Sequence, residues 1–328
     1  MKKQWFLFNG LAIVLCILMT FISCGGGGGG SADNGDAGNG GEDNSVVVID
    51  DTTPLCFTAL KDGSTVKLDV SQYGGPAVNP IVEYSSDGIN WNAYTLGTVL
   101  TLVKIDDKVY FRGDNATFCD DTGEMTFVIT GKIQGSGNIM SLVDKTMQSK
   151  IIPCDCCFDV LFEGCDKLTR APALPATTLT EGCYYAMFRD SGLTAAPALP
   201  ATTLADSCYE RMFKNCTSLT TVPSLPATTL TYHCYCEMFS GCSNLAEVPE
   251  LRAETLVDCC YDSMFYDCAS LTSIKVYFTD WNEGDDATTG WVDGVGNSGT
   301  RTFYYKTGLD VSTEDGDHVP AGWTKTLF

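Results

Sequence analysis

Cysteine is the residue type most able to do chemistry in this sequence, which holds 17 of them in 328 residues. Two clusters bring thiols together: Cys154-x-Cys156-Cys157, and His233-Cys234-x-Cys236. Thiolates and imidazoles bind zinc, and a cysteine activated by a histidine can act as a nucleophile. A structural zinc site needs four ligands in regularly spaced pairs, and neither cluster has that spacing. We therefore predict no metal site, no cofactor and no catalytic residue.

Most of the cysteines belong to a repeat. The run Leu174–Leu179 (L-P-A-T-T-L) recurs unchanged at 199–204 and 225–230, and a diverged copy occupies 251–256, so the spacing is 25 or 26 residues. Repeats of about 20 to 50 residues indicate a solenoid, in which each unit buries its apolar face against its neighbours. This organisation favours a binding or display scaffold over an enzyme, and we predict about five coils.

Nine cysteines fall in two columns of the repeat, where a free cysteine packs as a small apolar side chain. These residues are Cys157, Cys183, Cys208, Cys234, Cys260, Cys165, Cys216, Cys242 and Cys268.

Each unit has an extended half and a compact half. The stretch 168–174 is short, contains proline and alternates imperfectly, which predicts a short strand. The compact half places Cys183 and Met187 four residues apart, on one side of a helical turn. Each coil is therefore predicted to run strand, proline-led turn, short helix and tight turn, which makes the repeat region an α/β solenoid.

Two neighbouring columns of the extended half differ in polarity. The first is apolar throughout and is predicted to face inward; it comprises Ala171, Ala196, Val222, Val248 and Ile274. The second is mostly polar and is predicted to face solvent; it comprises Arg170, Ala195, Thr221, Glu247 and Ser273. Binding specificity would lie in exposed positions whose residue type varies between copies. The candidate ligand contacts are Arg170, Thr221, Glu247 and Glu250.

The pattern C-Y-x-x-M-F-x-x-C-x-x-L-T-x-x-P-x-L-P, over about 154–278, resembles the BspA-type leucine-rich repeat of bacterial surface proteins. Segments 109–115 and 137–142 resemble the domain that precedes these repeats in lipoproteins of gut anaerobes, and 291–295 with 319–324 resembles their C-terminal cap. The resemblance implies a cell-surface adhesion protein that binds host or bacterial proteins or glycans, with extracellular-matrix components among the partners of related proteins. It implies no catalytic activity.

The N-terminus has the features of a bacterial lipoprotein signal. Two lysines precede an apolar stretch, Trp5–Ile22, that is short for a membrane span. It ends in a small residue directly before Cys24, which resembles a lipobox. We predict a signal peptide at 1–23, a lipid on Cys24, and a position on the cell surface, anchored to the outer membrane of a Gram-negative bacterium. The alternative is an ordinary secretory signal with a chance cysteine.

Four further segments follow the signal. Residues 24–52 are rich in glycine and aspartate and predict a disordered tether. Residues 53–150 hold short apolar or alternating runs between turn residues, which predicts a small β-sandwich. The solenoid is assigned to 151–278 and a C-terminal cap to 279–328. The predicted strands of the sandwich are Leu55–Leu60, Thr65–Val70, Ile81–Tyr84, Val99–Val103, Lys108–Phe111 and Met125–Thr130.

The net charge of the chain limits the classes of molecule that it can bind. The chain carries 41 acidic and 20 basic residues, a net charge of −21, which disfavours binding to nucleic acid or to anionic lipid headgroups. Two functions stay open: a lipid-anchored binding protein that presents the repeat face, or a structural or antigenic coat lipoprotein without a specific ligand. One tripeptide, Arg112-Gly113-Asp114, could bind integrins if exposed, but it directly follows an apolar run and is predicted to begin a turn.

Overall fold

The computed structural model describes residues 51–77, 79–120, 122–281, 284–296 and 299–328. The described residues belong to one compact unit. The predicted signal peptide, Cys24 and nearly all of the predicted tether lie outside the described residues. In the part of the chain that is described, no helix has the length and hydrophobicity needed to cross a bilayer.

Residues 55–136 form two antiparallel sheets. One has the strand order β4-β3-β6-β1-β8 and the other β5-β2-β7. Buried and partly exposed residues alternate along the strands β2 and β7, as expected where one face of a sheet packs on a core. The six predicted strands are confirmed, and β4 and β8 add to them. The strands are β1 Leu55–Ala59, β2 Ser64–Val70, β3 Glu83–Ser85, β4 Asn92–Ala93, β5 Leu100–Leu102, β6 Lys108–Arg112, β7 Met125–Thr130 and β8 Ile133–Ser136.

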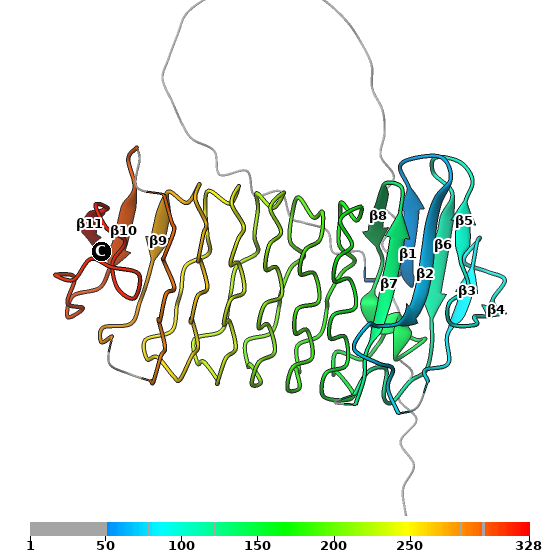
Figure 1. The fold of residues 1–328 in the computed structure, drawn as a ribbon. Helices are drawn as coiled ribbons and strands as arrows, with labels where there is room; N and C mark the ends of the chain where they lie inside the picture. Colours follow the sequence, from blue (N-terminus) through cyan, green and yellow to red (C-terminus); the bar gives the residue numbers. More distant parts are fainter. Residues whose placement is uncertain (1–50, 78, 121, 282–283, 297–298) are drawn as a thin grey trace, which may run out of the picture. The chain divides into compact units, whose positions relative to one another are not determined.

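The repeat units stack side by side as coils between β8 and the strand β9 (Ser273–Lys275) (Figure 1). In the compact half of each coil, alternate backbone N–H groups donate to carbonyl groups of the next coil. Tyr184 donates to Cys208 at 3.2 Å, and Phe188 donates to Met212 at 2.9 Å. Each coil therefore satisfies the backbone of its neighbour, as a solenoid requires.

The predicted α/β class is wrong, because the compact half contains no helix. Among the described residues the single helix is the 3₁₀ segment η1 (Ile139–Leu142) that follows β8. Every fourth residue of the compact half instead has a positive φ: 58° at Gly182, 47° at Ala186 and 58° at Asp190. Such left-handed residues cannot belong to a right-handed helix. The fold is a helix-free stack of coils, not an α/β leucine-rich-repeat solenoid.

A chain of turns replaces the helix. Between the left-handed residues, N–H groups donate to the carbonyl three residues back, as from Tyr185 to Gly182 at 2.9 Å and from Arg189 to Ala186 at 3.0 Å. The resulting period is four residues. Cys183 and Met187 are both fully buried, so they do share a face, but the four-residue turn period puts them there.

The extended half of each coil is less regular than predicted. Neighbouring coils are joined there by isolated parallel bridges, such as Ala195 with Thr221 and Glu247 with Ser273. Each copy carries a proline, which lacks an N–H donor and limits ladder formation. Among the residues that the structure describes, a continuous parallel sheet appears only at the C-terminal end, where β9 pairs with β10 (Thr302–Tyr305) and β10 with β11 (Thr324–Leu327).

Two columns of stacked aromatic rings run along the core. The phenylalanine column starts in the sandwich at Phe127 and continues through Phe162, Phe188, Phe213, Phe239 and Phe265, with centroids 5.3–6.1 Å apart. A tyrosine column runs beside it through Tyr184, Tyr209, Tyr235 and Tyr261.

The two ends of the coil stack are covered by different elements. At one end, the sandwich contacts the first coil through Phe127, whose N–H also donates to the carbonyl of Leu161 at 2.8 Å. At the other end, Trp291 lies 6.2 Å from Phe265 and accepts its N–H at 2.9 Å. The predicted cap thus continues the backbone ladder of the coils and closes the apolar core.

Candidate functional site

The four predicted contact residues line one groove on the extended side of the coils. A hollow of about 440 Å³ reaches from β8 to Ser224 and includes Arg170 and Thr221. A second hollow of about 400 Å³ includes Thr221, Glu247 and Glu250. The two hollows share residues 221–224, so we treat them as one feature and call it the proline groove.

The floor of the proline groove corrects part of the sequence prediction. Ala171 and Ile274 are buried as predicted, but Ala196, Val222 and Val248 of the same column are only half-buried and line the hollows. The prolines that follow them also line the groove, which therefore has an apolar floor and a polar rim; they are Pro197, Pro223 and Pro249.

The ends of the groove carry opposite charge. Arg170 and Glu247 are exposed, and within the described residues neither makes an ion pair. Glu250, in contrast, accepts hydrogen bonds from Lys275 Nζ at 2.7 Å and Tyr277 OH at 3.0 Å. The hydrogen bond from Lys275 holds the pKa of Glu250 below its ordinary value. Arg170 and Glu247 are thus the charges available to a ligand, and whether they contact one stays a prediction.

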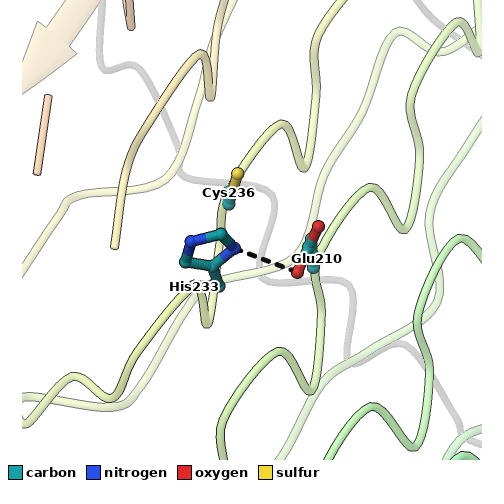
Figure 2. A group of neighbouring side chains, drawn as sticks. All are labelled: Glu210, His233 and Cys236. Carbon is teal, nitrogen blue, oxygen red and sulfur yellow. Dashed lines mark hydrogen bonds and ion pairs between the residues drawn. The ribbon is translucent and has the colours of Figure 1, made fainter. Parts of the chain in front are cut away.

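A second group of chemistry-bearing side chains lies in the compact half (Figure 2). The ligand atoms of Glu210, His233 and Cys236 all lie within 4.8 Å of one another. His233 Nδ1 is 3.3 Å from Glu210 Oε2. Glu210 and Cys236 are buried, with 6% and 3% of their surface exposed, whereas His233 is half-buried. The group therefore opens to solvent through the imidazole.

The four-residue period explains which thiol joins this group. His233 occupies a left-handed position with a φ of 53°. Cys234 follows it into the core and is fully buried, whereas the Cys236 side chain, also buried, lies beside His233. Both thiols are conspicuous in the sequence, but Glu210, which lies one repeat before Cys236 in the same column, was not predicted. Adding one repeat length to each position would have revealed it.

The electrostatics around Cys236 hold its thiol neutral. Burial, followed by the carboxylates of Asp262 and Glu210, raises the pKa of Cys236 to about 12, and Arg211 opposes the shift. Arg211 Nη1 lies 3.7 Å from Glu210 Oε1, so the other carboxylate oxygen is the one that faces His233. Among the described residues, the cluster Cys154-x-Cys156-Cys157 does not bring three possible metal ligands together.

Asp159 stands in the same column as Glu210 and Cys236, at the junction with the sandwich. It is 8% exposed, and within the described residues its Oδ1 has no hydrogen-bond partner. Burial, then the carboxylates of Glu124 and Glu163, raises its pKa to about 8. The folded state therefore binds more protons than the unfolded state between about pH 4 and pH 8, and Asp159 lowers stability as the pH rises through that window.

We predict that Asp159→Asn stabilises the fold at pH 8 by about 1–3 kcal/mol, because the neutral amide removes a buried charge. The gain should shrink towards zero at pH 5, where Asp159 is protonated. Urea unfolding at both pH values measures it, with the exposed Asp206→Asn as the matched control. An equal gain at both pH values would contradict the assignment of the proton to Asp159.

The Arg112-Gly113-Asp114 run is held by contacts within its own domain. Arg112 ends β6, pairs with Glu83 at 2.7 Å and lies 3.9 Å over the Trp91 ring. A Cβ at Gly113 would lie 2.5 Å from a backbone oxygen, so the chain requires glycine there. Asp114 accepts the backbone N–H of Lys145 at 2.9 Å. These contacts give the tripeptide a role in the fold.

In comparisons with known proteins, no protein-family model, curated protein or solved structure matches this chain. The resemblance to BspA-type surface proteins stays a prediction, and the proline groove and the Glu210 group are the features from which function can be argued.

Proposed function

We propose that this protein is a lipid-anchored cell-surface binding protein whose proline groove holds an extended segment of a host or bacterial protein. The observation that carries the proposal is the groove itself, with an apolar floor, a polar rim and an unpaired charge at each end. Binding sites are concave and mostly apolar, with a few polar groups that fix orientation.

The separation of the two charges sets the length of the bound segment. Arg170 and Glu247 lie three coils apart, and stacked strands are spaced by about 4.8 Å, which gives roughly 14 Å. An extended chain advances about 3.3 Å per residue, so roughly four residues span the groove. The matching segment carries an acidic residue against Arg170 and a basic residue four or five positions away against Glu247.

The location rests on the sequence at Cys24. A lipid there would place the compact unit on a tether of roughly 28 glycine-rich residues, with a reach of about 30 Å. The net charge of −21 would keep the unit away from an anionic membrane and leave the groove open to solvent.

Binding of the full-length protein to panels of matrix proteins and glycans tests the proposal. Thr221→Trp fills the middle of the groove, and Glu247→Arg reverses the charge at one end. We expect saturable binding to a protein ligand that either variant weakens at least about tenfold, while Asp206→Arg, an exposed acid outside the groove, leaves it unchanged. Absence of saturable binding in both panels would favour the coat-protein alternative, and binding to glycans alone would rule out the peptide groove.

A further inference from the structure

We propose that Glu210, His233 and Cys236 form a binding site for one zinc-like divalent cation, separate from the proline groove. The three side chains supply one oxygen, one nitrogen and one sulfur atom, all within 4.8 Å of one another. Thiolate, imidazole and carboxylate together suit a borderline-soft ion such as Zn²⁺ and not Mg²⁺ or Ca²⁺, which prefer oxygen ligands.

The geometry fits tetrahedral coordination. Zinc lies about 2.0–2.1 Å from nitrogen and oxygen ligands and about 2.3 Å from sulfur, so tetrahedral neighbours are separated by about 3.3–3.6 Å. The observed distance from His233 Nδ1 to Glu210 Oε2 is 3.3 Å. The pair therefore already has the spacing of two zinc ligands. Cys236 Sγ lies within 4.8 Å of both atoms and needs to approach them by roughly 1 Å at most to complete the set.

Charge also balances at this site. Binding requires the Cys236 thiol to release its proton, after which the thiolate and the Glu210 carboxylate neutralise a divalent ion beside neutral His233. Within the described residues the Cys236 thiol makes no hydrogen bond that metal binding would break. The positive Arg211, 3.7 Å from Glu210 Oε1, is already paired with Glu237 at 2.6 Å. Three protein ligands leave a fourth position for water.

The repeat makes the site unique within the coils. The coil before it has Ser207 in the position of His233, and the coil after it has Cys259 there and Asp262 in the position of Cys236. Neither neighbour forms a group of three possible ligands among the described residues. The site therefore takes one ion per chain, and that ion joins two successive coils.

Metal binding to the purified full-length protein tests the assignment. Zn²⁺ is titrated against a chelating dye, and Co²⁺ is used as a spectroscopic substitute. We expect one tight site, a thiolate-to-cobalt charge-transfer band, and the visible bands of tetrahedral Co²⁺. Because an ion that joins two coils stabilises the folded state, Zn²⁺ should also raise the Tm.

Three variants remove the ligands with replacements that the repeat tolerates or that keep the shape: Cys236→Ser, His233→Ser and Glu210→Gln. Each should weaken Zn²⁺ binding by at least about 100-fold, since even partners outside the ligand shell contribute about 10–100-fold. The matched control is Cys259→Ser, which removes a half-buried thiol one coil away and should keep full affinity.

Two results would overturn the proposal. The first is equal affinity in the protein and in Cys236→Ser, which would assign binding to other thiols. The second is no tight site in a protein whose thiols are fully reduced. If another ligand variant unfolds, the Glu210→Gln variant decides the question. It retains both His233 and Cys236, so its affinity can be followed by the charge-transfer band, and that affinity should still fall.

Discussion

Phe213→Ala should lower the free energy of unfolding by about 3–5 kcal/mol, the range for deleting a buried aromatic ring. Phe213 is fully buried and stands in the middle of the phenylalanine column. Its ring stacks on Phe188 and on Phe239, with centroids 5.7 Å away in both directions. Because each coil contacts only its neighbours, the cavity also weakens the coupling between the two halves of the stack.

Guanidinium unfolding followed by circular dichroism measures the loss, and limited proteolysis shows where the stack opens. The matched control is Tyr266→Ala, which removes a ring that is 43% exposed and should change stability by less than about 0.5 kcal/mol. We expect Phe213→Leu to fall between the two. A loss of less than about 1 kcal/mol in Phe213→Ala would mean that the column does not couple the coils.

The repeat period and the buried cysteine columns could be predicted from the sequence, because identical residues at fixed spacing must occupy equivalent places. The sandwich strands could also be predicted, since the alternation of apolar and polar residues in Thr65–Val70 is typical of a half-buried strand. The helix was not. A four-residue turn period and a 3.6-residue helical period place Cys183 and Met187 on one side alike. Only the left-handed φ values distinguish them, and Ala186 gives no sequence signal for one.

The candidate sites, too, could be predicted only in part from the sequence. The groove residues Arg170, Thr221 and Glu247 occupy one column of the repeat, so they could be predicted by aligning the copies. The depth of the groove depends on how far Val222 sits from the core, which residue type alone does not determine. The Glu210 group was missed because its ligands come from two coils, 23 and 26 residues apart.

Thiol alkylation of the folded protein should be highly selective for Cys154 over the buried cysteines of the repeat columns. The hydrogen bond with Cys157 lowers the pKa of Cys154 to about 7, against opposition from burial and from Asp155 and Asp120. Burial raises the pKa of Cys183 to about 12 and that of Cys260 to about 12. Only the thiolate reacts, so at pH 8 the thiolate fractions of these groups differ by roughly 10³–10⁴-fold.

The pH profile identifies the cause. Iodoacetamide labelling of the native protein, read out by mass spectrometry, should rise with pH for Cys154 and level off above about pH 8. Cys183 and Cys260 should stay unlabelled until the chain unfolds, when all thiols return to an ordinary pKa of about 8.5. Cys157→Ala removes the hydrogen bond, so it should move the Cys154 profile to higher pH without exposing the buried column.

Selectivity of this kind bears on how a surface protein of the proposed kind would keep its thiols free. The nine cysteines of the repeat columns are free and buried. A neutral, buried thiol neither attacks a disulfide nor reacts with an oxidant at a useful rate, so the core of the stack protects its own cysteines. If Cys183 were labelled in the native state as fast as Cys154, the coils would open on the labelling timescale and this protection would fail.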